Sequence, residues 1–445
     1  MRDTIDSGEA RRLAVAASGL GRAPGSGAAG AASALRRLGA VQIDTISVVE
    51  RAHHHILWSR LRRYKAADLA RLEAEPRAAF EYWSHAAAYL PMAEYPYCLS
   101  RMERIRAQGH EWFRAEAAAV DYVRARVAEE GPLRAQDFEE PMKGARGWWD
   151  WKPAKVALEY LFHAGELAVV GRRGFQKVYD LAERALPAAL AMRRPSPRDE
   201  AAHHLDRAVA SLGVFSRNEI AYLRKDGLAE IDAELAARLE AGSLVELRLG
   251  PGASRVGGTG KTEGGGRSNP SCYAAPAALE DLAAEPARPA PRVIVLSPFD
   301  PLVIDRRRLL RLFGLDYQLE CYVPEAKRRF GYFALPLLYR DGRGDWSVAA
   351  LLDARADRKT GLLELKRLTL EPFFADTARG SRGRRSNTAA AEALPGALAK
   401  ELARFAAFNG AERLALGRLD CPDEGLARAL TEALTAVRPP AQSTE

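Results

Sequence analysis

Two polar residues that could do chemistry lie close together near the start of the chain. Gln42 and Asp44 flank a single isoleucine in the stretch "GAVQIDTISVVE". If this stretch is extended, its side chains alternate, so Gln42 and Asp44 share one face while Val41 and Ile43 anchor the other. In a helix the two polar residues would lie about 200° apart and could not cooperate. The spacing therefore predicts a site only if the segment is a strand or a turn.

The residues that follow indicate where the next helix begins. "SVVE" fits a capping box with Ser47 as the N-cap and Glu50 three positions into the helix. This pattern leaves residues 42–44 outside the helix, as the site requires. A purely structural alternative is that Asp44 supports a turn and Gln42 bonds a neighbour, and spacing alone favours it.

The predicted helix over residues 48–63 carries two kinds of face. Val49, Ala52 and Ile56 form an apolar stripe that points inward. The polar and aromatic residues predicted to face DNA on this helix are Arg51, His53, His54, His55, Trp58, Arg60 and Arg62. Cations beside an aromatic ring suit phosphate contact with stacking or wedge insertion. The alternative is that Trp58 packs into the core and the arginines are solvated.

No metal site or nucleotide site is expected. The three consecutive histidines point about 100° apart on a helix, so they do not converge on one ion. "RVGGTGKTEGGG" resembles a phosphate-binding loop, but Arg255 stands where the first glycine belongs, and more glycine follows where a helix should begin. We therefore predict no cofactor and no nucleoside triphosphate.

The composition favours a polyanionic partner inside the cell. Of the 445 residues, 66 are Lys or Arg and 58 are Asp or Glu, giving a net charge of +8. The cysteines, which are Cys98, Cys272, Cys321 and Cys421, lie far apart and show no metal-ligand spacing, as in a reduced protein. Without a bilayer-length apolar run or a signal-peptide pattern, the expected location is cytoplasmic and nucleoid-associated, with no membrane partner.

Helical and strand-like segments alternate in a repeating order. Helix, short helix, longer helix and hairpin follow one another from "DYVRARVAEE" to "GRRGFQKVYDL", which is the winged-helix pattern. We predict a mainly α protein with β-hairpin wings (α+β): winged helices at 8–115, 116–190 and 197–250, a Gly/Ala/Pro-rich linker at 251–291, and a C-terminal β-rich α+β domain at 292–437. Three copies in one chain indicate a monomer.

The second repeat offers further cations for DNA. Lys152 and Lys155 lie at the start of its longer helix, which opens at Pro153. Arg172 and Arg173 lie in the predicted hairpin turn between Gly171 and Gly174. Contact with phosphate is one interpretation of these residues, and solvated surface charge is the other.

Several stretches together resemble one known family. They are "VQIDTISVVERAHHHILWSRL", "FEYWSHAAAYLP", "GWWDWKPAKVALEYLFHAGEL" and "LSPFDPLVIDRRRLLRLFGLDYQLECYVPEAKRRFGYFALPLL". Spread from about residue 39 to residue 338, they resemble the winged-helix DNA glycosylases that unhook interstrand crosslinks, the YcaQ-like family. Tyr82, Trp83 and His85 belong to the matched pattern, and their role stays open between site and core.

The resemblance implies a fold, an activity and a site. It implies three tandem winged helices, a C-terminal β-rich domain, and a catalytic Gln-x-Asp motif that falls on Gln42 and Asp44. The implied reaction is hydrolysis of the N-glycosidic bond of N7-alkylated or crosslinked guanine in double-stranded DNA, without a metal or other cofactor. The rival interpretation is a non-catalytic tandem winged-helix protein, such as a transcription regulator.

Overall fold

The computed structural model divides the chain into two compact units. It describes residues 3–21, 25–61, 63–74, 77–138, 153–186, 191–224, 226–250, 271–283, 289–372 and 384–440, with backbone alone for 384–389. Unit 1 comprises Met1–Pro24, Asp44–Arg60 and Ala202–Glu445, and unit 2 comprises Gly25–Ile43 and Leu61–Ala201. Each unit is therefore discontinuous in sequence, and the chain passes from unit 2 to unit 1 between Ile43 and Asp44.

The first half of unit 2 is a small sheet beside short helices. Its strands run in the order β2-β4-β3 and are antiparallel. The elements are α2 (Gly27–Leu38), β2 (Val41–Gln42), α4 (Ala66–Glu73), β3 (Ala79–Trp83), β4 (Ala87–Pro91), the 3-10 helix η1 (Met92–Cys98) and α5 (Leu99–Gln108). Helix α2 ends at Gly39, whose left-handed φ of 74° only glycine adopts readily. Strand β2 can therefore begin at Val41, close behind the end of the helix.

The second half of unit 2 has the predicted order of helices and hairpin. Its elements are α6 (Ala117–Glu130), β5 (Leu133–Arg134), the 3-10 helix η2 (Ala135–Phe138), α7 (Pro153–His163), β6 (Leu167–Arg173), β7 (Gln176–Leu181) and α8 (Ala182–Ala185). The strands pair in the order β5-β7-β6. The hairpin turn lies at Gly174 and Phe175, both at positive φ, and not at 171–174 as predicted. Arg172 and Arg173 consequently belong to strand β6.

Unit 1 contains a second helical assembly closed by a four-stranded sheet of order β1-β9-β10-β8. Its elements are β1 (Thr4–Ile5), α1 (Ser7–Ala17), α9 (Pro197–Leu212, which begins in unit 2), β8 (Val214–Phe215), α10 (Arg217–Ile220), α11 (Leu228–Glu240), β9 (Val245–Leu249), β10 (Ser271–Ala274) and α12 (Pro276–Ala283). Asp6 and Glu9 form a capping box that starts α1. Of the predicted linker 251–291, residues 251–270 and 284–288 lie outside the described residues, whereas β10 and α12 occupy most of 271–283 and correct the prediction there.

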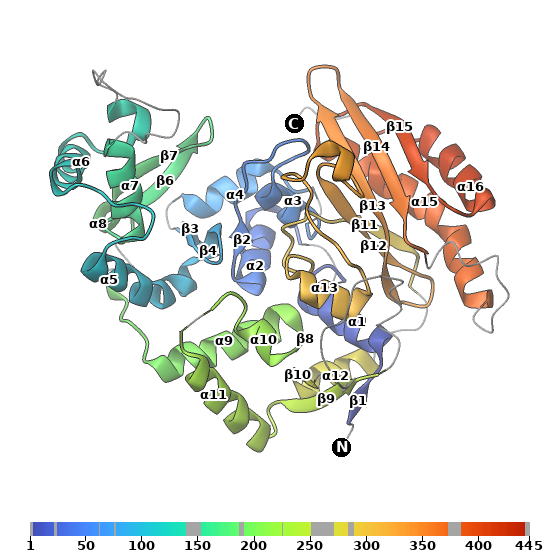
Figure 1. Ribbon diagram of the computed structural model, residues 1–445, viewed down its shortest axis with the longest axis horizontal. Coiled ribbons are helices and arrows are strands. Elements are labelled where there is room, and N and C mark those ends of the chain that lie inside the picture. The colour runs from blue at the N-terminus through green and yellow to red at the C-terminus, as the bar shows by residue number, and fades with distance from the viewer. Residues whose placement is uncertain are drawn as a thin grey trace. The chain divides into compact units, whose positions relative to one another are not determined.

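The rest of unit 1 is a five-stranded sheet of order β11-β12-β13-β14-β15 (Figure 1). The elements are β11 (Arg292–Val295), α13 (Arg306–Phe313), the 3-10 helix η4 (Glu325–Lys327), β12 (Ala334–Arg340), β13 (Trp346–Asp357), β14 (Leu362–Leu370), α15 (Arg384–Phe408), β15 (Arg413–Asp420) and α16 (Glu424–Thr435). Strands β11 to β14 pair antiparallel, and β15 joins the sheet parallel to β14. Helices α15 and α16 pack against each other and against this sheet.

Helix α3 (Ala52–Trp58) is much shorter than the helix predicted over 48–63. Its N-cap is Arg51 without a side-chain cap bond, so the predicted capping box of Ser47 and Glu50 is wrong. The backbone N–H of Glu50 donates instead to Asn409 Oδ1 at 2.7 Å. A partner in the turn directly after α15 thus satisfies a group that was expected to be capped locally.

Candidate active site

Gln42 lies in β2 with its side chain partly exposed, whereas its neighbours Val41 and Ile43 are buried. The Ile43 N–H donates to the Ala87 carbonyl oxygen at 2.8 Å, which continues the β2–β4 pairing one residue further. The predicted alternation of apolar and polar side chains is therefore confirmed at this strand. At the tip of the β3–β4 hairpin, His85 Nε2 lies 3.0 Å from Gln42 Oε1.

Asp44 follows in a turn of unit 1. One carboxylate oxygen accepts a hydrogen bond from the Ile46 N–H at 2.8 Å, the local turn that aspartate forms readily. Burial raises the pKa of Asp44 above its ordinary value of 3.8, although the N–H groups of Ile46 and Thr45 and the charge of Arg51 act in the opposite direction. A carboxylate with a raised pKa is a stronger base, which suits proton transfer from water.

A loop from the C-terminal part of unit 1 reaches the surroundings of Asp44. Burial raises the pKa of the Cys321 thiol, and the negative charge of Asp44 raises it further. Glu320 holds this loop, because its carboxylate accepts from the N–H groups of Arg329 and Phe330, each at 2.8 Å. The carboxylate of Asp44 thus lies near a fixed loop that is remote in sequence.

The chain between Asp44 and α3 is held by distant elements. The Ala356 N–H of β13 donates to the Val48 carbonyl oxygen at 2.7 Å. Arg358, in the turn after β13, forms an ion pair with Glu50 at 3.2 Å. With the bond to Asn409 described above, these contacts fix a segment that forms no regular structure of its own.

The contacts of Gln42 and Asp44 match both interpretations of the motif. A bonded neighbour for Gln42 and a turn at Asp44 are what the structural alternative expects. The same contacts also fix the orientation of the two side chains, which a catalytic site needs.

Three residues of α3 that were predicted to contact DNA lie in the core. His53, His55 and Trp58 are buried, with Trp58 only 6% exposed. The Trp58 ring stacks on Phe408 of α15 with centroids 4.8 Å apart, and His55 Nε2 lies 2.9 Å from the Val295 carbonyl oxygen. The prediction of DNA contact is wrong for these side chains, because both faces of the short helix are covered. The inward stripe of Val49, Ala52 and Ile56 is confirmed.

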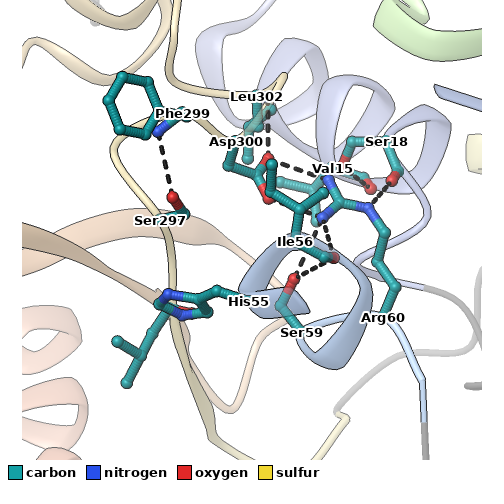
Figure 2. A network of polar contacts seen from close by, with 11 residues as sticks. Val15, Ser18, His55, Ile56, Ser59, Arg60, Ser297, Phe299, Asp300 and Leu302 are labelled. Atoms are coloured by element: carbon teal, nitrogen blue, oxygen red, sulfur yellow. Dashed lines mark hydrogen bonds and ion pairs between the residues drawn. The ribbon is translucent and has the colours of Figure 1, made fainter. Parts of the chain in front are cut away.

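Arg60 is also a core residue (Figure 2). Its guanidinium forms two hydrogen bonds with the Asp300 carboxylate, at 2.6 and 2.9 Å, and a third with the Ser18 carbonyl oxygen at 2.7 Å. The side chains of Arg60 and Asp300 are 2% and 0% exposed. Arg60 therefore links α3 to the loop after β11 and does not present its charge to a phosphate.

The hairpin cations divide into one structural and one exposed residue. Arg172 forms a bidentate pair with the buried Glu81 of β3, at 2.8 and 3.0 Å, and lies over the Phe175 ring. Its predicted DNA contact is corrected to an ion pair that joins the two sheets of unit 2.

The other cations and the histidine predicted to contact DNA differ in exposure. Arg173 and Lys155 are exposed, and Arg51 and His54 are partly buried. Arg62 and Lys152 lie outside the described residues.

His85 is one of three residues, with Tyr82 and Trp83, whose role the sequence left open. Its partner could have been found by predicting a β3–β4 hairpin at "FEYWSHAAAYLP" and pairing it with residues 41–42. Tyr82 and Trp83 lie in the core of unit 2, where the Tyr82 hydroxyl donates to the His163 carbonyl oxygen at 2.7 Å. Of the three residues left open, only His85 thus touches the candidate site.

Within the ranges given above, no three His, Cys, Asp or Glu side chains are grouped so that they could hold a metal ion. In the same part of the chain, no helix combines the length and apolar character that crossing a bilayer requires.

Comparison with known proteins identifies the family. The sequence profile of the AlkZ-like DNA glycosylases matches residues 35–408. The chain therefore belongs to the AlkZ-like family of DNA glycosylases, and its resemblance to such enzymes is confirmed. Among solved structures, DNA glycosylase AlkZ of Streptomyces sahachiroi is similar, with a TM-score of 0.57, 15% identity, and coverage of 93% of this chain and 100% of that one. This likeness confirms the α+β fold class.

Proposed function

We propose that this protein hydrolyses the N-glycosidic bond of N7-alkylated guanine in double-stranded DNA, including guanine joined in an interstrand crosslink. The observation that carries the proposal is the partly buried carboxylate of Asp44, two residues beyond Gln42 in a member of a DNA glycosylase family. In this proposal the enzyme acts as a monomer and uses no cofactor.

The substrate needs little help from an acid. N7-alkylguanine carries a positive charge, so when the C1′–N9 bond breaks, its electron pair passes to the base, which leaves neutral. The sugar becomes oxocarbenium-like and is attacked at C1′ by water. One carboxylate can stabilise that positive charge and accept the water proton, so the paired carboxylates typical of sugar hydrolases are unnecessary.

Asp44 is proposed as that carboxylate. Its raised pKa makes it a stronger proton acceptor than an ordinary aspartate. The Ile46 N–H fixes one of its oxygens. The remaining lone pairs of the carboxylate can stabilise the positively charged sugar and accept the proton of the attacking water. Gln42 is proposed to orient the reacting groups, and its amide is held by His85.

A crosslinked substrate constrains how the DNA is approached. Most glycosylases rotate the target base out of the stack, but a base tied covalently to the opposite strand cannot rotate freely. We therefore expect the enzyme to reach the sugar from a groove while the base remains largely stacked. A fluorescent base analogue opposite N7-methylguanine tests this point, because full extrusion on binding would brighten it and would contradict groove access.

The decisive experiment is single-turnover release from a duplex carrying one N7-methylguanine, scored as alkali-labile sites. Wild type is compared with Asp44→Asn, and binding of both proteins to the same duplex is measured in parallel. We expect release by wild type and loss of about 100-fold or more in a variant that still binds, since general base help typically contributes 10²–10⁴-fold.

The rival function, a non-catalytic DNA-binding protein, predicts the opposite result in this assay. A non-catalytic winged-helix regulator would release no base from this duplex or from a crosslinked one, would prefer a particular DNA sequence, and would be indifferent to Asp44→Asn. Equal release by wild type and Asp44→Asn would leave a glycosylase whose catalytic carboxylate lies elsewhere.

A further inference from the structure

The contact between His85 and Gln42 fixes which end of the Gln42 amide is available to a substrate. His85 Nε2 lies 3.0 Å from Gln42 Oε1. Because a carbonyl oxygen can only accept, this contact is a hydrogen bond only in the tautomer that carries the proton on Nε2. In that tautomer the Gln42 carbonyl oxygen has its donor, and the amide NH2 group, with two N–H bonds, is the end directed elsewhere.

The position of His85 is determined by the sheet rather than by sequence proximity. Gln42 pairs with Ala88 across β2 and β4, and Trp83 pairs with Ala87 across β3 and β4. These pairings place the hairpin tip, residues 84–86, beside the end of β2. The Ser84 N–H donates to the Ala86 carbonyl oxygen at 2.9 Å and tightens this tip. His85 thus approaches Gln42 from a braced turn.

The imidazole is kept in its neutral form. Burial lowers the pKa of His85 below its ordinary value of 6.5. A neutral ring has one donor nitrogen and one acceptor nitrogen, so its tautomer matters, and donation to Gln42 requires the proton on Nε2. His85 can therefore hold the amide in one orientation across the neutral pH range.

We infer that His85 is a positioning residue of the active site, which orients Gln42 so that its amide N–H bonds point to an acceptor oxygen of the reacting DNA or its water. This inference rests on the proposed function. It assigns Gln42 the role of a donor only, and it leaves Asp44 as the group that accepts the water proton. His85 itself does not touch the reacting atoms.

The chemistry of the sugar narrows what Gln42 can bind. A hydrogen bond to the ring oxygen O4′ would draw electrons away from an oxocarbenium-like sugar and would oppose the reaction. A non-bridging phosphate oxygen is a better acceptor, because hydrogen bonds to a charged partner are stronger. The attacking water is the other acceptor that fits. Both acceptors, the phosphate oxygen and the attacking water, present an oxygen lone pair to an N–H bond of Gln42.

The first test reads the tautomer and needs no activity. Nitrogen-15 shifts of the histidine rings are recorded in the full chain at pH 7, with the His85→Gln spectrum assigning the His85 signals. We expect neutral His85 with its proton on Nε2, and a shift of those signals in Gln42→Ala. A proton on Nδ1 would mean that the amide is turned the other way, and the inference would be overturned.

The second test is a double-mutant cycle on the single-turnover rate. Losing one oriented hydrogen bond costs about tenfold, so His85→Phe should be about tenfold slower than wild type. The same change should have no further effect in the Gln42→Ala background, because His85 acts through Gln42. His85→Gln, which retains an N–H donor, should recover most of the rate. Additive losses, or no recovery by His85→Gln, would contradict the inference.

Two controls separate positioning from damage to the fold. Ser84→Ala perturbs the same hairpin tip without touching Gln42 and should match wild type. Gln42→Glu offers only acceptors, so it should be at least as slow as Gln42→Ala; a rate near wild type would show that Gln42 accepts and would overturn its donor role. If wild type itself releases no base, the proposed function fails, while the tautomer measurement still decides how Gln42 is oriented.

Discussion

Arg60 and Asp300 form a bidentate ion pair from which water is excluded, with side chains 2% and 0% exposed. Two charges in a low-dielectric interior are stable only as a pair, because removing either leaves the other without compensation. The Ser18 and Ile56 carbonyl oxygens accept further hydrogen bonds from the same guanidinium (Figure 2). This network joins α1, α3 and the loop after β11 within unit 1.

Replacing Arg60 should therefore damage folding. We expect Arg60→Met to lower the free energy of unfolding by about 3–5 kcal/mol, since the Asp300 carboxyl group is left buried without its partner. The double variant Arg60→Met/Asp300→Leu should be more stable than Arg60→Met alone. Chemical denaturation measures both values. Unchanged stability together with weaker DNA binding would instead favour the original prediction of a phosphate contact.

Asp44→Asn should remove activity without a loss of stability. Because the folded-state pKa of Asp44 is raised, the folded protein binds this proton more tightly than the unfolded chain, so ionisation of Asp44 opposes folding at neutral pH. Asparagine removes that charge and can still accept from the Ile46 N–H. A melting temperature equal to or above that of wild type is expected, and a clear decrease would indicate that the carboxylate is structural.

The rate should depend on pH through Asp44. The ionised form is the one that accepts a proton, so the rate should fall as pH decreases through the pKa of Asp44. The fall should begin at a higher pH than for an ordinary aspartate, whose pKa is 3.8. Single-turnover rates corrected for spontaneous depurination and for the folded fraction measure the profile. A flat profile down to pH 4 would contradict this role.

Acid should destabilise unit 1 through His55. Burial lowers the pKa of His55 from 6.5 to about 4. The unfolded chain takes up this proton below pH 6.5 and the folded protein does not, so stability is full above pH 6.5 and decreases as pH falls toward 4. The loss is on the order of 3 kcal/mol. His55→Gln, which keeps a donor but does not titrate, should lose less stability between pH 7 and pH 4.5.

Arg173 and Arg172 of the same strand should differ in their effects on DNA binding. Arg173→Ala should weaken binding to any duplex and lower by about one the slope of log affinity against log salt concentration, with an unchanged melting temperature. Lys155→Ala should also weaken binding to any duplex. Arg172→Ala is the matched comparison, because it leaves Glu81 buried without its bidentate partner and should lower the melting temperature. Affinity measured at several salt concentrations distinguishes these outcomes.

The sequence by itself determined the features that depend on local periodicity. The alternation at residues 41–44 predicted which side chains of β2 are buried, and the order of helices and hairpin in 117–181 matches a winged helix. The Gln-x-Asp spacing singled out the candidate site, and the matched stretches indicated the family. Each of these signals is carried by neighbouring residues along the chain.

Only the tertiary structure decided which polar residues are covered. His55 and Arg60 meet Val295 and Asp300, each partner 240 positions away in sequence. Periodicity shows which side chains share a face of a helix, but it cannot show that a second element will cover that face. The same reason hid His85, whose contact with Gln42 depends on how three strands pair. Such contacts form when remote segments pack, so they follow from the fold and not from local sequence.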